Sequence, residues 1–365
     1  MPRSDGLLVI EGLKTHFFTD DGVVRAVDGV DLNLPEGKTV CVVGESGCGK
    51  SITARSILGL VESPGRVVDG HVWWRTDGAG TNGAAAAGED RVDLAAYDIR
   101  GERMRKIRGN EISMVFQEPM ASLSPVYTVA NQLVEAIQVH LPLSKEDAWK
   151  RGIGLLERVG IPRPERTMGS YPFQLSGGMC QRVMIAIALA CEPRLLIADE
   201  PTTALDVTTQ ARIIDLLIDI QRDTGMAMMF ITHDLGVVAE IADEVIVMYL
   251  GTVVEQGGVD EIFHDPKHPY TRALLDSIPT MGRGVRQRLS SIRGQVPHPL
   301  DRPRGCPFQP RCDHEVPGLC DMVEPPTVTL ADERRVRCVL HDPDLLRKHE
   351  LRQGTGVRVD GGEGA

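Results

Sequence analysis

Apolar residues recur along the chain at two spacings, which predict strands near its start and a helical segment further on. Over residues 7–43, short apolar runs separated by Asp-Gly and Glu-Gly turns predict strands and hairpins. Over 129–159, apolar positions recur at helical spacing until Pro162 and Pro164 end the pattern. We therefore expect a helical segment inside a chain that otherwise mixes strands and helices.

Outside that segment, helical and buried-strand patterns alternate. Helices are expected at 51–61, 183–190 and 212–221, buried strands at 195–198 and 226–232, and a final strand pair at 244–249 and 252–256. This alternation predicts a parallel sheet with crossover helices. The low-complexity stretch 76–89 and the tail after 353 have no periodic apolar face, so a flexible insertion and a disordered tail are expected there.

Composition narrows the class of protein. A chain of 365 residues suggests two to three domains. No window reaches the roughly 18 to 20 uncharged apolar residues of a membrane span, and the start lacks the apolar core of a signal peptide, so we expect a cytosolic protein. The net charge of −11 gives no positive field for nucleic acid or anionic lipid, which makes a DNA-binding role a weak expectation.

A glycine-rich phosphate-binding motif follows the third predicted strand. The octet fits the pattern G-x-x-x-x-G-K-[ST] and consists of Gly44, Glu45, Ser46, Gly47, Cys48, Gly49, Lys50 and Ser51. Its glycines let backbone N–H groups turn toward phosphate oxygens, and the helix that follows adds its positive N-terminus. We expect Lys50 to reach the β and γ phosphates and Ser51 to bind Mg²⁺.

A second motif supplies the carboxylates that the phosphate loop needs beside it to hold a metal ion. The apolar strand at 195–198 ends in Asp199 and Glu200. Asp199 is expected to contact Mg²⁺ through water, and Glu200 to orient and polarise the attacking water. An apolar strand that ends in two acids is common, and it is the pairing with the phosphate loop that makes the functional interpretation strong.

The segment Leu175-Ser-Gly-Gly-Met-Cys-Gln181 resembles the signature of the ATP-binding cassette (ABC) family. The resemblance implies that Ser176, Gly177 and Gly178 bind the ATP held by a second cassette, so that one subunit alone cannot complete a site. Further elements of the family stand in order, namely Gln117, Ala204-Leu-Asp206 and His233.

The resemblance also implies a role for each of these elements. Gln117 would link the metal and the attacking water to a helical subdomain, Asp206 would cross the dimer interface, and His233 would contact the γ phosphate. Phe17 stands where the family usually stacks an aromatic ring on adenine; Phe18 is an alternative, and core packing remains open for either.

Within that family the chain is similar to the ATPase subunits of bacterial oligopeptide and dipeptide importers, over about residues 7–345. The segments that carry the similarity are 117–125, 171–174 and His268-Pro-Tyr-Thr-Arg-Ala-Leu-Leu275. Phe173 and Cys180 depart from the usual His and Arg of this branch. Every motif residue needed for hydrolysis is present, so an active ATPase is expected.

The eight cysteines fall into two sets. Cys41, Cys48, Cys180 and Cys191 are expected to be small buried thiols. Cys306, Cys312, Cys320 and Cys338 are separated by five, seven and 17 residues, without the C-x-x-C of a compact zinc site. Resemblance to the importer branch implies a [4Fe-4S] cluster; Zn²⁺, for which His314 and His341 could compete as ligands, and metal-free thiols are the alternatives.

The resemblance implies an α/β fold: a P-loop ABC nucleotide-binding domain with a parallel-sheet core, an antiparallel β subdomain and a helical subdomain, followed by a small Cys-rich C-terminal domain. We expect the cassette at 1–279, its helical subdomain at about 118–175, the Cys-rich domain at 280–345 and the tail at 346–365.

The expected function is that of an importer's ATPase. The chain would power uptake of di- and oligopeptides with ATP and Mg²⁺ on the cytoplasmic face of the membrane. Its partners would be two permease subunits, a second ABC ATPase that is expected to be a different chain and, indirectly, an extracytoplasmic peptide-binding protein, with no nucleic acid. The alternatives are a soluble non-transport ABC ATPase and a zinc-bearing nucleic-acid module at the Cys-rich end. The sequence does not identify the solute.

Overall fold

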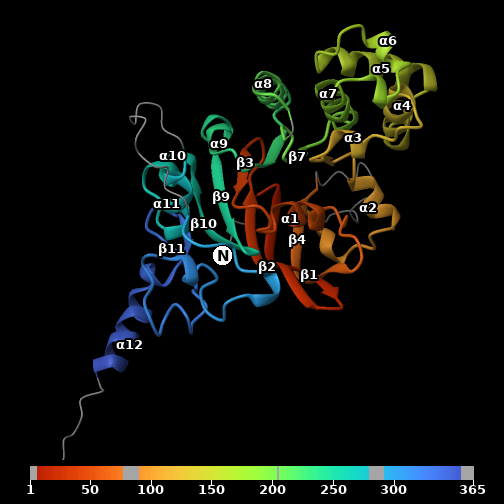
Figure 1. Ribbon diagram of the computed structural model, residues 1–365. Helices are drawn as coiled ribbons and strands as arrows, with labels where there is room; N and C mark the ends of the chain where they lie inside the picture. Colours follow the sequence, from red (N-terminus) through yellow and green to blue (C-terminus); the bar gives the residue numbers. More distant parts are fainter. Residues whose placement is uncertain (1–5, 77–89, 204, 279–291, 355–365) are drawn as a thin grey trace, which may run out of the picture.

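A mixed sheet forms the centre of the computed structural model, which describes residues 6–76, 90–203, 205–278 and 292–354 (Figure 1). Its middle strands pair in parallel and its β9–β10, β10–β12 and β11–β12 pairs are antiparallel. In spatial order the strands are β11 (Thr327–Thr329), β12 (Arg335–Arg337), β10 (Thr252–Gly258), β9 (Glu244–Tyr249), β3 (Thr39–Val43), β8 (Ala227–Ile231), β7 (Leu195–Asp199) and β6 (Ile112–Val115). The predicted parallel sheet is thus confirmed, with an antiparallel extension at one edge.

The strands predicted at the start of the chain belong to two different sheets. An antiparallel sheet has the order β2 (Gly22–Leu34), β1 (Leu8–Thr19), β4 (Gly65–Arg75) and β5 (Arg91–Asp93). Its apolar face packs on α1 (Lys50–Ile57) and on one face of the main sheet, in a core that includes Trp74 and Ile57. The third predicted strand, β3, instead lies in the main sheet between β8 and β9.

The main sheet is buried on both faces, as its apolar strands require. Along β7, Leu195 and Ile197 pack into the core shared with the antiparallel sheet, whereas Leu196 and Ala198 pack into a second core. Successive side chains of a strand point to opposite faces, so a strand covered on both sides is apolar throughout.

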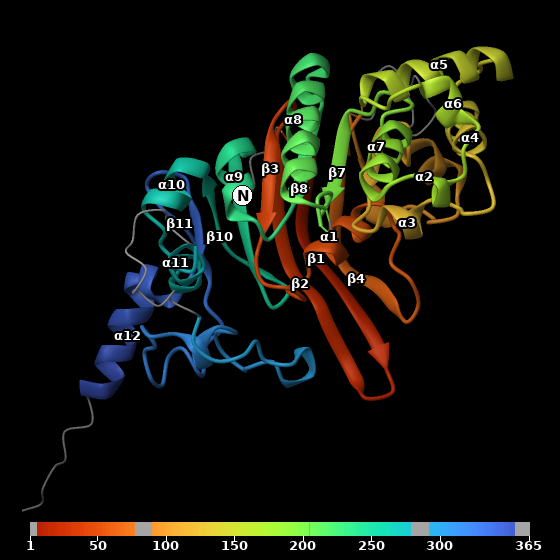
Figure 2. The same cartoon turned by 45° about the horizontal axis from the view of Figure 1, so that its top comes forward.

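Helices cover the sheet and form a group of their own beside it, seen at the upper right of Figure 2. The helices after α1 are α2 (Glu102–Ile107), α3 (Pro119–Ser122), α4 (Val129–His140), α5 (Lys145–Arg158), α6 (Pro164–Met168), α7 (Gly177–Ala188), α8 (Val207–Thr224), α9 (Leu235–Ile241), α10 (Val259–His264), α11 (Pro269–Asp276) and α12 (Pro343–Gly354). Within the described ranges, no helix has the length and apolar character that crossing a membrane requires.

The segment predicted as helical over 129–159 is two helices. α4 ends before Pro142, and Ser144 then caps α5 by accepting a hydrogen bond from the N–H of Asp147. Pro164 begins α6, because proline is tolerated in the first turn of a helix, where its missing N–H has no partner to lose. The expected insertion (apart from Thr76) and most of the expected tail lie outside the described residues.

The C-terminal segment, residues 292–354, shares a sheet and an apolar core with the cassette. β12 pairs with β10 through Val336 and Glu255, so the last strands extend the main sheet. The ring of Phe308 is buried, with its centroid 5.3 Å from each of the Tyr249 and Tyr270 rings. A boundary near 279–280 stays a prediction, since residues on both sides of it share one apolar core.

Phe308→Ala should destabilise the cassette and the C-terminal segment together. Removing a buried aromatic ring typically costs about 3–5 kcal/mol of the free energy of unfolding. Thermal unfolding should show one transition at lower temperature, while Met322→Ala, at an exposed position of the same segment, should leave it unchanged. A native cassette transition after Phe308→Ala would show that the two parts do not share a core.

Candidate nucleotide-binding and hydrolysis site

The phosphate loop joins β3 to α1 in a conformation that its glycines make possible. Gly44, Gly47 and Gly49 have φ values of 147°, 79° and 102°. A Cβ on Gly44 would lie 2.2 Å from the Met248 carbonyl oxygen, and one on Gly49 would lie 2.3 Å from that of Ala26. Both the positive φ angles and this close packing exclude a larger residue at these two positions.

The lysine of the loop is buried and folded back along it. The Lys50 Nζ donates to the carbonyl oxygens of Gly44 at 2.8 Å and Glu45 at 3.1 Å. Cys48 is also buried, and burial raises the pKa of its thiol. The ammonium group of Lys50 therefore lies within the concave loop that precedes α1, where it can reach a bound phosphate.

A hydroxyl and a carboxylate meet beside the loop. The Ser51 Oγ donates to Asp199 Oδ1 at 2.8 Å. Asp199 ends β7 and is buried, and this burial raises the pKa of its carboxyl group. Oxygen donors next to a phosphate loop suit Mg²⁺, which usually takes one or two protein ligands together with phosphate oxygens and water.

Side chains from three parts of the chain surround Glu200. The Gln117 Nε2 donates to Glu200 Oε2 at 3.0 Å, and the Thr203 Oγ1 donates to the same oxygen at 2.9 Å. The His233 Nδ1 lies 3.5 Å from Glu200 Oε1. One carboxylate oxygen thus accepts two hydrogen bonds, and the other faces the exposed histidine. Such an arrangement can orient a water and accept its proton.

The backbone at Glu200 is itself unusual. Its φ of 45° is in the left-handed region, which is costly for a residue with a side chain. Its N–H donates to the Ile231 carbonyl oxygen at 2.9 Å, so the turn is fixed against β8.

Thr203, whose hydroxyl donates to Glu200, was not predicted from the sequence. The spacing Glu-x-x-Thr after an apolar strand is the signal that could have identified it.

The remaining motif residues begin two helices. The Ser176 Oγ accepts from the Met179 N–H and caps α7, with Gly177 exposed beside it. Asp206 caps α8 by accepting from the Thr209 N–H and from hydroxyl groups, and these donors lower the pKa of Asp206 to about 2. Both caps are exposed, so their roles toward a second subunit stay predictions.

The two aromatic candidates for adenine have different surroundings. The half-buried Phe17 ring packs against Gly65, where a Cβ would lie 2.5 Å from the ring. Phe18 is exposed, and the Arg66 guanidinium lies 4.3 Å from the centre of its ring. Stacking of Phe17 on adenine stays a prediction.

The two departures from the importer branch lie side by side. Cys180 is buried in α7, and its Sγ donates to the Pro172 carbonyl oxygen at 3.4 Å. Phe173 is exposed and stacks on Tyr171, with ring centroids 5.5 Å apart. Both side chains are uncharged, so α7 carries no cation at position 180.

The four C-terminal thiols gather in one region. Cys306, Cys320 and Cys338 are buried and Cys312 is partly buried. Burial raises the pKa of Cys306 to about 11 and that of Cys338 to about 12, with the other thiols of the set contributing. Among the residues that the structure describes, no three His, Cys, Asp or Glu side chains form a group that could hold a metal ion, so a preformed metal centre is not observed.

Comparison with known proteins agrees with this fold and site, which define an ATP-binding cassette. A dimeric ATP-binding cassette in a post-hydrolysis state bound to ADP and Pi is 27% identical, with a TM-score of 0.58 over 69% of this chain and 98% of that chain. The family model "ABC transporter" matches residues 27–203, and "Oligopeptide/dipeptide transporter, C-terminal region" matches 254–320.

Two relatives match nearly the whole chain. The oligopeptide transport ATP-binding protein AppD of Bacillus subtilis is 48% identical over 93% of this chain and 98% of its own. The dipeptide transport ATP-binding protein DppD of Escherichia coli is 46% identical over 91% and 96%. The chain therefore belongs to the ABC transporter family, as an ATPase of the group that contains these ATP-binding proteins.

Glu200→Gln should abolish most ATP hydrolysis and leave ATP binding intact. The amide keeps the size of the side chain but cannot accept a proton, and loss of a general base costs about 10²–10⁴-fold in rate. Phosphate release by the assembled ATPase measures the effect, and Glu240→Gln, at an exposed position of α9, is the control. A native rate in the Glu200 variant would remove this residue from the chemistry.

Proposed function

We propose that this chain is the ATP-hydrolysing subunit of an importer for di- and oligopeptides. The observation that carries the proposal is the order of the two family models, in which a cassette is followed by a region typical of oligopeptide and dipeptide transporters. The full-length similarity to AppD and DppD supports it. On this proposal the chain lies at the cytoplasmic face of a membrane and is bound there through its permease.

The chemistry follows from the positions of the side chains. Lys50 and the backbone N–H groups of residues 44–51 would hold the phosphates, and Ser51 with Asp199 would hold Mg²⁺. The metal would neutralise charge on the phosphate oxygens. Glu200 would take the proton of the attacking water, while Gln117 and His233 hold the water and the γ phosphate on either side of the carboxylate.

A second cassette would complete the site. Ser176 and Gly177 are exposed at the start of α7, where backbone N–H groups suit a phosphate from outside this chain. Asp206 is likewise exposed at the start of α8. We propose that the partner is a second ABC ATPase, of the same or a different chain, and that ATP closes the pair.

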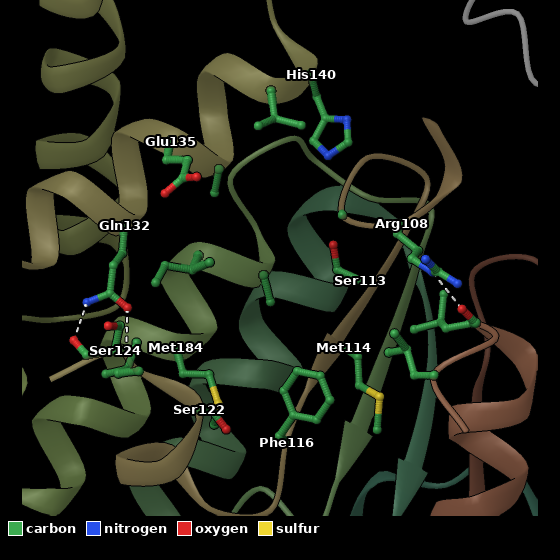
Figure 3. A pocket seen from close by; sticks show the side chains of 18 of the residues that line it. Arg108, Ser113, Met114, Phe116, Ser122, Ser124, Gln132, Glu135, His140 and Met184 are labelled. Atoms are coloured by element: carbon green, nitrogen blue, oxygen red, sulfur yellow. Dashed lines mark hydrogen bonds between the residues drawn. The ribbon is translucent and has the colours of Figure 1, made fainter. Parts of the chain in front are cut away.

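A groove beside the hydrolysis site is proposed to receive a cytoplasmic helix of the permease. This cavity of about 540 Å³ lies between β6 and helices α4 and α7 (Figure 3). Met114, Phe116 and Met184 line it with apolar surface, while Gln132 and Glu135 line it with polar groups. An amphipathic helix matches such a mixed lining.

The groove is connected to the hydrolysis site by one peptide bond. Phe116 lines the groove, and the next residue, Gln117, donates to Glu200. A helix seated against Phe116 could therefore bias the position of Gln117. Through this contact, a movement of the permease helix would change the surroundings of Glu200.

The Cys-rich end is proposed to hold a [4Fe-4S] cluster, with Zn²⁺ as the alternative. Burial raises the pKa of each of the four thiols, and a backbone N–H donor partly offsets that rise at each of them; N–H donors of this kind stabilise cluster sulfurs. Cys306, Cys312, Cys320 and Cys338 would be the ligands. A zinc site with histidine ligands is less favoured because His314 is exposed and the His341 Nε2 lies 3.2 Å from the Lys267 carbonyl oxygen.

A nucleic-acid role for this segment has less support. Five of its arginine side chains form ion pairs with acids within the chain. The pairs are Arg302 with Asp28, Arg311 with Glu45, Arg334 with Asp265, Arg335 with Asp31 and Arg337 with Glu324. Cations neutralised in this way contribute little to binding a phosphate backbone.

The proposed function can be tested with proteoliposomes that hold the assembled importer. The measurement is their uptake of labelled di- and tripeptides. Uptake should require MgATP and should be lost with Lys50→Ala. Val139→Asp, in the groove, should abolish uptake but leave MgATP affinity native, because it places a charge where an apolar helix face would pack. Leu351→Asp, at an exposed position of α12, is the control. ATP-driven transport of another solute only would disprove the peptide assignment.

Metal analysis of anaerobically purified protein tests the Cys-rich site. We expect iron and sulfide at about four per chain and broad absorbance near roughly 400 nm, both lost with Cys306→Ser. Cys191→Ser removes a thiol of the other set and should keep the cluster. One zinc per chain would support the alternative, and protein without metal would reject both.

A further inference from the structure

The second residue of the phosphate loop is held by the C-terminal segment. The Glu45 carboxylate accepts two hydrogen bonds from the Arg311 guanidinium, from Nη1 to Oε2 at 2.6 Å and from Nη2 to Oε1 at 3.0 Å. The two residues are 266 positions apart in the sequence. Two parallel bonds between a guanidinium and a carboxylate fix both the distance and the orientation of the pair.

The Arg311 side chain is buried deeply enough to be a fixed part of the structure. Only 3% of it is exposed, against 27% for Glu45. The Arg311 Nη1 donates to the Tyr249 hydroxyl at 3.3 Å, and the Arg311 Nε donates to the Arg293 carbonyl oxygen at 2.9 Å. Because removing a charged group from water is costly, a buried guanidinium is retained only where partners of this kind surround it.

The rest of Glu45 is also held. Its N–H donates to the Tyr270 hydroxyl at 2.9 Å, and its carbonyl oxygen accepts from the Lys50 Nζ at 3.1 Å. The loop lysine and the C-terminal arginine thus contact the same residue, one through its backbone and the other through its side chain. Arg311 and Lys50 are therefore linked through a single residue.

A carboxylate at this place in the loop opposes the loop's function. A phosphate loop binds an anion, and an unpaired negative charge within it repels that anion. We infer that Arg311 is a positioning residue of the ATPase, which pairs with Glu45 so that this carboxylate neither repels nor displaces the phosphates of MgATP. The inference rests on the proposed nucleotide site, and extends it to a residue of the C-terminal segment.

The position of Arg311 ties the loop to the four-Cys segment. Arg311 ends a short 3-10 helix, Gln309–Arg311, whose first N–H donates to the Cys306 carbonyl oxygen. The next residue, Cys312, donates its N–H to the Gln309 carbonyl oxygen. Two of the four thiols therefore flank the turn that carries the guanidinium, and the loop geometry at Glu45 depends on that turn.

Arg311→Met, in the full chain, tests the inference through the dissociation constant of MgATP, measured by fluorescence titration with a labelled nucleotide. We expect a loss of affinity on the order of tenfold, since a unit charge a few ångströms from the phosphates becomes unpaired. Arg311→Lys, which keeps the charge but not the two parallel bonds, should give a smaller loss. Adding Glu45→Gln to Arg311→Met should restore most of the affinity, because the double variant has no unpaired carboxylate.

Arg334→Met is the matched control. Arg334 is another C-terminal guanidinium that is 4% exposed, and it pairs with Asp265 and Asp332 away from the phosphate loop. We expect both Arg334→Met and Arg311→Met to lower the unfolding temperature, because each removes a buried, paired guanidinium, but Arg334→Met should leave the MgATP dissociation constant unchanged. This comparison separates a general loss of stability from an effect on the loop.

Three results would overturn the inference. Native MgATP affinity in folded Arg311→Met would show that the pair does not act on the nucleotide. An equal loss in the single and double variants would show that Arg311 acts by packing rather than through the Glu45 charge. Native MgATP binding by Lys50→Ala would show that the proposed nucleotide site itself is wrong. If Lys50→Ala loses MgATP binding and Arg311→Met does not, only the role of Arg311 is rejected.

Discussion

The parallel register of three neighbouring strands is the constraint on which the hydrolysis site depends. Val42 of β3 and Asp199 of β7 both align with Ile231 of β8. The phosphate loop, Glu200 and His233 follow these strand ends directly, and carboxyl ends of parallel strands meet at one edge of a sheet. A slip of one residue in this register would turn each side chain to the opposite face and separate the groups.

Negative charge on side chains at this edge of the main sheet has to be compensated, because the nucleotide that the site would bind is itself an anion. Each carboxylate there has a donor of its own: Ser51 for Asp199, Gln117 with Thr203 for Glu200, and Arg311 for Glu45. The partners differ in kind, and so do their consequences. Neutral donors leave Glu200 free to take a proton, whereas the guanidinium at Glu45 compensates a charge that has no part in the chemistry.

The C-terminal segment is therefore part of the cassette in a physical sense. It extends the main sheet through β12, it adds Phe308 to an aromatic cluster with Tyr249 and Tyr270, and it supplies the partner of Glu45. A segment with few apolar residues of its own gains stability by packing on an existing core. The same packing gives it a route to the phosphate loop.

The sequence by itself determined the chemistry of the motifs and the type of the elements that carry them. Glycines at 44, 47 and 49, the acids that end β7 and the Ser-Gly-Gly turn are local signals, because a turn, a strand end or a helix start depends on neighbouring residues. Apolar runs were enough to predict the buried strands β3, β7 and β8, since a strand covered on both faces has few polar positions to interrupt it. The buried strand β6, in which Ser113 interrupts the apolar run, was not predicted.

Only the tertiary structure decided which distant residues meet. Thr203 beside Glu200, Arg311 on Glu45 and Tyr270 on the loop backbone depend on how strands and turns pack, and no periodicity in the sequence encodes those contacts. The extension of the main sheet by β12 could not be predicted from the sequence either. Three residues make too short a strand to be recognised, and the partner strand is far away in the sequence. Local spacing therefore specified the parts of the site, and long-range packing specified their contacts.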